Sequence, residues 1–301
     1  MKKFNWKRYI KSRPDLKKNW NSPIRARFHF YTFRKSDDYK RKFKNLKIRN
    51  PFIKKPESIY FYTFHKCASS FFDKYVFDNL IGLKKIDYVG KLYNLEGRRK
   101  FVLRPKGKIY GPLRLTITGR NSLLPDTKTN ISFNNPEFIK DKLAIFMIRD
   151  PRDVLVSMYY SFGFSHPIFS EPKLEAVQIK RRRKIQNQTI DEFALDNVKI
   201  LLNAYETLDK LKQSCKGCVV LKYEDMILNW DIFKKGLLKY LSIKDQVLEE
   251  IYSRTRPRKN EDINLHKRSG AVNQYKNKLK KQTIKKLNII FKDILETYGY
   301  Q

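Results

Sequence analysis

Cysteine and long apolar runs are both scarce in this 301-residue chain. Its three cysteines, Cys67, Cys215 and Cys218, are an odd number in a long chain, which argues against a disulfide framework. No stretch reaches the roughly 18 consecutive apolar residues of a membrane-spanning helix, and the amino terminus lacks the apolar segment of a secretion signal. We therefore expect a soluble, cytoplasmic protein without a membrane span.

A second cysteine pair is also missing. Cys215 and Cys218 are spaced as a CxxC motif, but they precede a predicted strand, whereas a thioredoxin-type pair follows a strand and opens a helix. Without a second pair they do not supply the four ligands of a structural zinc site. We interpret them as small residues at a helix-to-strand turn.

Acidic residues are few. The chain has 30 Asp and Glu against 66 Lys and Arg, a formal net charge of +36, and such a field attracts polyanions over about 8 to 10 Å. Part of this excess has a compositional explanation, since Lys, Asn, Ile, Phe and Tyr, all abundant here, are encoded by A/T-rich codons. The charge makes this a strongly basic protein but does not identify its partner.

The basic excess is largest in residues 1–50, which hold eighteen Lys and Arg against three Asp, interleaved with aromatic residues. Such a mixture can line a nucleic-acid groove, or it can form an extension that packs on its own domain with a solvated basic face. We favour the second interpretation. The predicted division is an extension over 1–50 and a single domain over 51–301.

A strand, a charged turn and a helix follow one another in residues 143–162, LAIFMIRDPRDVLVSMYYSF. The apolar run 143–148 has strand length, Pro151 suits a first helical turn, and the following apolar residues recur at helical spacing. Arg149 then stands at the carboxyl end of a buried strand, with Ser157 two helical turns on, which predicts an anion site. Alternatively, the turn only caps the helix and forms a surface ion-pair cluster.

An earlier strand, 58–64, is followed by the small-residue run His65-Lys66-Cys67-Ala68-Ser69-Ser70 and a helix to about Leu80. Backbone N–H groups at a helix start attract a phosphate, and Lys66 adds a point charge. A Walker loop requires glycines, and this run has none. It is therefore a phosphate loop of another kind or a tight turn.

The rest of the chain alternates between predicted strands and helices, which indicates an α/β fold with a parallel sheet and helices on both faces. Residues 86–133 give weak β signals between Gly, Pro and Asn, and we expect loops over the sheet there. The basic run 180–184 is either a mobile lid or a solvated helix face. Further predicted elements are a helix over 190–212 opened by a Thr189–Glu192 capping box, a strand over 219–223, and helices over 230–241, 246–252 and 283–298.

Taken together, three of these segments resemble the sulfotransferase family, whose members use 3'-phosphoadenosine 5'-phosphosulfate (PAPS). TFHKCASSF resembles the family's 5'-phosphosulfate loop TYPKSGTTW: Lys66 is kept, two serines replace the threonines, and Phe71 stands at the adenine-stacking tryptophan. It departs at His65, Cys67 and Ala68. Arg149 and Ser157 match the 3'-phosphate motif.

The third segment, HKRSGAVNQYK, resembles the family's late RKGxxGDWK motif, and Tyr223 matches a tyrosine near the adenine. The resemblance covers residues 58–298 and implies a P-loop-like α/β fold that moves a sulfuryl group from PAPS to a hydroxyl or amine without a metal. The donor contacts that it implies are Lys66, Cys67, Ala68, Ser69, Ser70, Phe71, Arg149, Ser157, Tyr223, Arg268, Ser269 and Gly270. Lys66 is expected to act on the leaving phosphate.

The general base is less clear, because no histidine lies between His65 and Arg149, where many family members have one. His166 and His65 are the candidate catalytic bases, and a carboxylate is a further option. The acceptor is open: an acidic glycan or a small hydroxylated molecule would fit, and nucleic acid is not expected as a physiological partner. The alternatives to a sulfotransferase are a basic nucleic-acid-binding protein and, less favoured, a P-loop nucleotide kinase.

Overall fold

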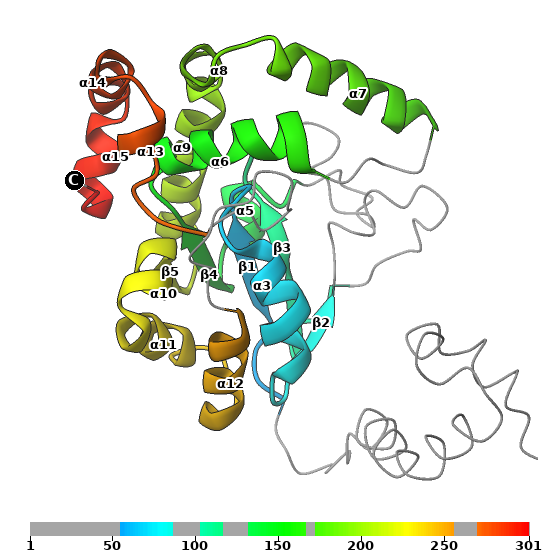
Figure 1. Ribbon diagram of the computed structural model, residues 1–301. Coiled ribbons are helices and arrows are strands. Elements are labelled where there is room, and N and C mark those ends of the chain that lie inside the picture. Colours follow the sequence, from blue (N-terminus) through cyan, green and yellow to red (C-terminus); the bar gives the residue numbers. More distant parts are fainter. Residues whose placement is uncertain (1–54, 87–102, 117–131, 167–171, 256–269, 301) are drawn as a thin grey trace, which may run out of the picture. The chain divides into compact units, whose positions relative to one another are not determined.

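The computed structural model describes residues 55–86, 103–116, 132–166, 172–255 and 270–300 (Figure 1). The predicted extension over 1–50 lies outside these ranges. The described strands are β1 (Ile59–Thr63), β2 (Lys84–Ile86), β3 (Lys108–Arg114), β4 (Leu143–Ile148) and β5 (Gly217–Lys222). They form one sheet in the order β2-β3-β1-β4-β5, and all neighbours are parallel. The predicted α/β class with a parallel sheet is confirmed.

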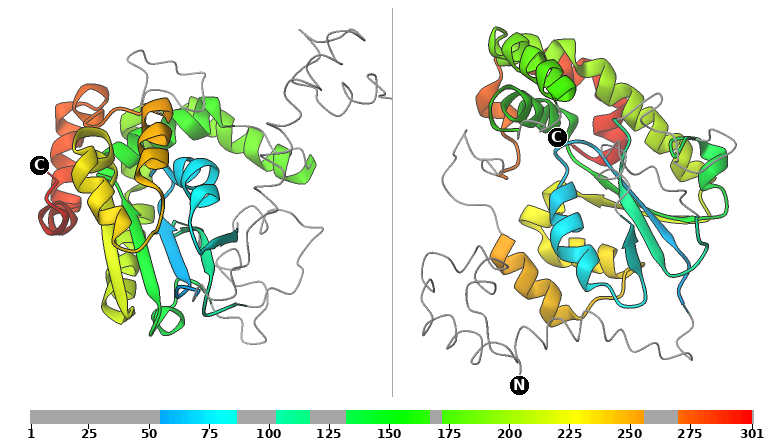
Figure 2. Two further views of the ribbon diagram at one scale, coloured as in Figure 1. Left: turned by 90° about the horizontal axis from the view of Figure 1, so that it is seen from below. Right: turned by 90° about the vertical axis from the view of Figure 1, so that its right-hand side faces the viewer.

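The central strand β1 is buried along its whole length, because helices cover both faces of the sheet (Figure 2). Its side chains alternate between the faces. Phe61 packs on Phe72 and Phe77 of one helical layer, with ring centroids 4.3 and 5.1 Å apart, whereas Tyr60 meets Phe138 on the other side at 5.2 Å. Such a two-sided environment explains why the strand is a continuous apolar run.

Helical segments connect these strands and continue after β5. The first layer starts with α3 (Ser69–Phe71), which continues through the π-helix η2 (Phe72–Val76) and the 3-10 turn η3 (Phe77–Asn79). The others are α5 (Pro136–Ile139), α6 (Pro151–Tyr160), η5 (Ser161–Ser165), α7 (Pro172–Gln186), α8 (Ile190–Asp196), α9 (Val198–Ser214), α10 (Tyr223–Leu228), α11 (Trp230–Leu238), α12 (Asp245–Thr255), α13 (Tyr275–Lys278), α14 (Lys281–Ile290) and α15 (Lys292–Tyr298). No helix in these ranges is long and apolar enough to cross a membrane.

Residues 86–133 were expected to supply loops over the sheet with weak β signals, but residues 108–114 of this region form a full strand, β3, which pairs with both β1 and β2. The Gly111-Pro112 pair reads as a strand breaker, but the ladder absorbs it by a shift in register opposite Tyr60 and Tyr62. Gly111 has φ 145°, and a Cβ there would lie 2.6 Å from the Phe61 carbonyl oxygen. Only glycine fits this close approach, so the apparent breaker belongs to the strand.

Two predicted helices are each divided in two. The Thr189–Glu192 capping box is confirmed, with Glu192 N–H donating to Thr189 Oγ1 and Thr189 N–H donating to the Glu192 carboxylate. The helix it opens ends at Asp196, and α9 starts after Asn197, where φ is −108° and ψ 5°. Phe291 divides the last predicted helix in the same way. Apolar periodicity runs through such a one-residue kink, so the sequence pattern does not reveal it.

Candidate active site

Four neighbouring strands each present a polar or charged side chain at the carboxyl edge of the sheet. Arg114 ends β3, Lys66 follows β1, Arg149 follows β4, and Tyr223 follows β5. The connections after β1 and β4 leave toward opposite sides of the strand order, which opens a crevice between these two strands. The predicted Lys66 loop and Arg149 turn border this crevice.

A cavity of about 330 Å³ occupies this edge. It is lined by most of the residues predicted for the site: His65, Lys66, Ala68, Ser69, Ser70, Phe71, Arg149, Ser157, His166, Tyr223 and Gly270. Cys67 is not among the lining residues, and Arg268 and Ser269 lie outside the described ranges. The fold thus brings together residues that are more than two hundred positions apart in sequence, from Lys66 to Gly270.

The Lys66 loop is held in an unusual backbone conformation. Lys66 and Ala68 have φ of 65° and 53°, in the left-handed region that favours glycine. The Ala68 carbonyl accepts hydrogen bonds from the Phe71 and Phe72 amides and so starts the helical segment Ser69–Asn79. Alternating left- and right-handed residues make a concave array of N–H groups that suits an anion. Positions 66 and 68 adopt this left-handed conformation although the loop contains no glycine.

The Cys67 side chain points into the core rather than into the cavity. It is fully buried, its Sγ lies 3.6 Å from the His65 carbonyl oxygen, and burial raises the pKa of its thiol. Its neighbour in the loop behaves differently: Lys66 Nζ donates to Ser161 Oγ at 3.1 Å, across the cavity on η5. Cys67 anchors the loop while Lys66 spans the cavity.

The Arg149 guanidinium is 3% exposed and joins three parts of the chain. Nη1 donates to the Lys66 carbonyl at 3.2 Å, and Nη2 donates to Asp153 at 3.2 Å and to the Ala271 carbonyl at 2.8 Å. The guanidinium carbon also lies 4.2 Å from the ring centre of Tyr223, whose hydroxyl donates to the Gly270 carbonyl. Arg149 thus faces the cavity and also holds its walls together.

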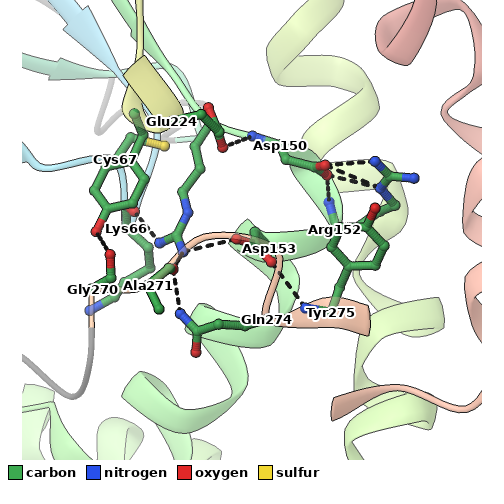
Figure 3. Close-up of polar contacts among 12 residues, drawn as sticks. Lys66, Cys67, Asp150, Arg152, Asp153, Glu224, Gly270, Ala271, Gln274 and Tyr275 are labelled. Carbon is green, nitrogen blue, oxygen red and sulfur yellow. Dashed lines mark hydrogen bonds and ion pairs between the residues drawn. The ribbon is translucent and has the colours of Figure 1, made fainter. Parts of the chain in front are cut away.

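The rest of this turn is a buried polar network (Figure 3). Asp150 caps α6 by accepting from the Arg152 amide and forms an ion pair of 2.7 Å with the Arg152 guanidinium. Asp153 accepts from the backbone amide of Tyr275 at 3.0 Å. The turn caps its helix, as one interpretation of the sequence held, but its ion pairs are buried rather than at the surface.

Glu224, in the first turn of α10, supports the Arg149 turn through a backbone contact. One carboxylate oxygen accepts from the Asp150 amide at 3.0 Å (Figure 3). Burial raises the pKa of Glu224 to about 7, despite the nearby positive charge of Arg149. This side chain was not singled out from the sequence, because its partner is a backbone amide 74 residues earlier.

His65 bridges the first and third strands. Its Nε2 lies 3.4 Å from Nη1 of Arg114, and its Nδ1 contacts Thr116 Oγ1. Burial, followed by the charge of Arg114, lowers the pKa of His65 well below its usual value. Nε2 faces a guanidinium, which only donates, so Nε2 is the accepting nitrogen of this ring.

His166 is held by helix α7. Its Nδ1 lies 3.2 Å from the Gln178 amide nitrogen, and its carbonyl accepts from Arg182. Arg181 lies over Phe162, with 4.4 Å between the guanidinium carbon and the ring centre. The basic run 180–184 lies on this helix with most of its side chains exposed, yet two of them contact the cavity wall at η5.

The two π-helical segments within the described ranges border the cavity: η2 contributes Lys74 and Tyr75, and η5 contributes Ser161, Phe162 and Ser165. π-turns occur often at functional sites, and they rotate the side chains that follow. Ser161 was missed from the sequence, although it stands four residues after Ser157 and so on the same helix face. Arg114 was missed because the end of β3 was hidden behind Gly111-Pro112.

Comparison with known proteins gives a family. A model of the sulfotransferase domain matches residues 129–299, more than half of the chain. The chain belongs to the sulfotransferase family. The matched residues include the Arg149 turn and begin after the Lys66 loop. The predicted sulfotransferase class is confirmed.

Among solved structures, the crystal structure of mouse sulfotransferase SULT7A1 complexed with PAP is similar to this chain, with a TM-score of 0.49 and 14% sequence identity. The alignment covers 79% of this chain and 84% of that chain. A search of curated proteins gives no match.

The sulfotransferase cavity carries positive charge without acidic residues among its described lining. Lys66, Lys74, Arg114 and Arg149 all line it, and no Asp or Glu of the described residues does. Within the same ranges, no three His, Cys, Asp or Glu side chains cluster as a metal site would require. The described lining is suited to highly charged anions.

Proposed function

We propose that this sulfotransferase moves the sulfuryl group of PAPS to a hydroxyl or amine acceptor and releases adenosine 3',5'-bisphosphate. The observation that carries the proposal is that Lys66 and Arg149 line one cavity at the carboxyl ends of adjacent parallel strands. PAPS carries phosphate groups at both ends of its ribose, so two cationic elements facing one cavity match its charge distribution.

Lys66 and its loop act on the leaving phosphate. Sulfuryl transfer builds negative charge on the bridging oxygen, and prearranged donors that meet this charge lower the barrier. Lys66 Nζ, the N–H groups at the start of the helical segment and the hydroxyls of Ser69 and Ser70 are the donors available on this wall. Phe71 offers an aromatic ring at the cavity edge for the adenine.

Arg149 and Ser157 read the 3'-phosphate, joined by Arg268, Ser269 and Gly270 from the late motif. Arg149 is the fixed charge of this group, since its guanidinium is held by Asp153 and two carbonyls. Ser157 lies on the cavity side of α6. Tyr223 stacks on the guanidinium and completes the wall.

His166 is the better candidate for the base. His65 has a lowered pKa and directs its lone pair at Arg114, which makes it a weak proton acceptor. Gln178 contacts Nδ1 of His166. The Gln178 amide nitrogen donates to Nδ1, so Nδ1 is the ring nitrogen with the lone pair, and His166 acts as the base when this hydrogen bond is exchanged for the acceptor's proton.

The test is thermal stabilisation by adenosine 3',5'-bisphosphate, AMP and ATP, each with and without magnesium. We expect a selective, magnesium-independent shift with the bisphosphate, corresponding to about 2.7 kcal/mol at a hundredfold excess over Kd. The shift should be lost in Lys66→Ala and Arg149→Ala. Lys216→Ala is the matched control, because Lys216 pairs with Glu57 at the surface and does not line the cavity.

Two outcomes would contradict the proposal. Equal shifts with AMP and the bisphosphate would mean that no 3'-phosphate site exists. Absence of any shift, together with tight and salt-sensitive binding to DNA or RNA, would favour the nucleic-acid alternative.

A further inference from the structure

Helix α14 carries an apolar side chain at the centre of the side that faces solvent. Its inward face is marked by Leu287, which is fully buried, and by Thr283, which is 5% exposed. Ile289 is 77% exposed, the highest fraction among the large apolar residues of the described ranges. At about 100° per residue, its side chain points roughly 160° away from that of Leu287. Ile289 therefore projects from the domain and takes no part in the core.

Lysines surround Ile289 on the outer face of α14. Lys285 and Lys286 precede it by four and three residues, the spacing at which helical side chains are neighbours. Lys281 lies one turn before Lys285, and Lys292 follows at the start of α15. All four lysines are exposed. The outer face thus combines an apolar centre with concentrated positive charge.

Acidic side chains do not neutralise these four lysines through ion pairs within the described part of the chain. On α8, which packs against α14, Asp191 accepts from the Lys280 amide at 2.9 Å, and the Glu192 carboxylate is used in the capping box. On α15, Asp293 and Glu296 form no ion pair with any of the four lysines. The charge of the outer face is therefore available to a partner from outside.

Helix α11 offers a comparison, because its exposed isoleucine lies in mixed charge. Ile232 is 65% exposed, but the side chain of the preceding Asp231 is 95% exposed. Lys234, on the same helix, lies 4.0 Å from Asp231 and pairs with Glu249 at 2.7 Å. An exposed isoleucine alone indicates no partner, since single apolar side chains are common on protein surfaces. What distinguishes α14 is the set of lysines on the same face as its isoleucine.

We propose that the outer face of α14 docks on the surface of an anionic lipid bilayer, where Lys285 and Lys286 meet the headgroups and Ile289 enters the apolar boundary. A bilayer surface offers both parts of this match, since negative headgroups overlie an apolar layer. Lysine suits such a boundary, because its methylene groups lie along apolar surface while its amine reaches the headgroups.

Other polyanions and a second copy of the chain fit this face less well. Nucleic acid would be attracted by the same lysines but offers no apolar layer for Ile289. A second copy would bring two basic faces together in a chain whose formal net charge is already +36. The face lies outside the cavity, so this inference does not depend on the proposed function.

The experiment measures co-sedimentation of the full chain with vesicles of phosphatidylcholine alone and of phosphatidylcholine mixed with phosphatidylserine. We expect binding to the mixed vesicles. The double variant Lys285→Gln/Lys286→Gln should bind them roughly 25-fold more weakly, because each lysine near an anionic surface contributes about fivefold. Its matched control is Lys235→Gln/Lys239→Gln, which removes the same charge from exposed positions of α11, a helix well apart from α14 in Figure 1. This control should change the affinity by less than about threefold.

The apolar contact is tested separately. Ile289→Ser leaves the charge unchanged and should weaken binding to the mixed vesicles by about fivefold or more, because less apolar surface enters the boundary. Ile232→Ser is the matched control and should leave the vesicle affinity within about twofold of the wild type. Binding to duplex DNA, which probes charge alone, should be the same in Ile289→Ser as in the wild type. The thermal midpoint of each variant shows that it is folded.

Equal weakening in the two double variants would overturn the inference, because it would show a general effect of charge. An unchanged vesicle affinity in Ile289→Ser would also overturn it, and so would self-association of the chain that this substitution abolishes. Binding of this face to DNA without binding to vesicles would assign it to nucleic acid instead. None of the substituted side chains lines the cavity, so the bisphosphate shift should persist in every variant, and its absence from the wild-type chain would contradict the proposed function alone.

Discussion

The two proposed anion-binding elements of this sulfotransferase, the Lys66 loop and the Arg149 turn, are built in opposite ways. The Lys66 loop is local: its geometry comes from two left-handed residues and from hydrogen bonds between neighbours in sequence. The Arg149 turn is made from distant segments, with Arg149 bound to Ala271 and Asp153 bound to Tyr275, each 122 residues away. The Lys66 loop thus depends on its own backbone conformation, whereas the Arg149 turn is a junction between segments that are distant in sequence.

Because of this difference, substitutions in the two elements should affect ligand binding and protein stability to different degrees. The Lys66 Nζ reaches across the cavity to the Ser161 hydroxyl, so its loss removes a positive charge from the cavity wall. The ion pair of Arg149 and Asp153 is buried at both ends, so removing one partner leaves the other as an isolated charge. We therefore expect the loop to fail mainly in catalysis and the turn to fail in folding as well.

The largest effect should come from Asp153→Asn, which should lower the free energy of unfolding by about 3 kcal/mol because Arg149 remains buried without its counter-charge. Lys66→Ala should lower kcat by roughly 10² to 10³, with a change in stability of less than about 0.5 kcal/mol. Urea unfolding and labelled-sulfate transfer measure the two quantities. Equal losses of stability in both variants would remove the distinction between the elements.

The second effect is on the pH dependence of stability, and it concerns Glu224, which supports the Arg149 turn. Because the pKa of Glu224 is raised from 4.5 to about 7, folding favours its protonated form. The stability that this adds is complete below about pH 4.5 and is lost as the pH rises through 7, a change of about 3 kcal/mol at most. Glu224→Gln should flatten this slope in urea unfolding between pH 5 and 8.

Glu250→Gln is the matched control for Glu224, since Glu250 is an exposed carboxylate on α12 paired with Arg254. It should keep the wild-type dependence of stability on pH. A slope that is unchanged in Glu224→Gln would show that the burial of this carboxylate does not matter for the turn.

A smaller effect tests whether any loss of stability weakens donor binding. Thr189→Ala removes the capping box of α8, which lies outside both elements, and should cost about 1 kcal/mol. The thermal shift caused by adenosine 3',5'-bisphosphate should stay at its wild-type size. A reduced shift would mean that donor binding follows global stability rather than the two elements.

The smallest effect should be a gain. Ala68 has φ 53°, so Ala68→Gly relieves a strain of about 1 kcal/mol and adds entropy to the unfolded chain, for a net stabilisation of roughly 0.5 kcal/mol. Calorimetric unfolding measures it. A loss of stability would mean that the Ala68 methyl group packs well enough to outweigh the strain.

The same contrast explains what could be predicted from the sequence. The Lys66 loop and the strand before Arg149 are each formed by consecutive residues, so the local sequence pattern was enough to predict them. The contacts that join the Arg149 turn to residues 271 and 275 could not be predicted in this way, because the carbonyl of Ala271 and the amide of Tyr275 are backbone groups that carry no residue-specific signal. Arg114 escaped notice because Gly111-Pro112 concealed its strand, and Glu224 because its partner is a backbone amide.

The junction also affects the order of events during synthesis. Ala271 and Tyr275 are made 122 residues after their partners Arg149 and Asp153, which at ribosomal rates of about 5 to 20 residues per second is a delay of roughly ten seconds. Throughout that interval Arg149 and Asp153 lack these backbone contacts on the nascent chain. The buried polar network of the Arg149 turn is therefore completed only after the residues of α13 have emerged, so a chain whose synthesis stops before them lacks two of the hydrogen bonds that hold this turn.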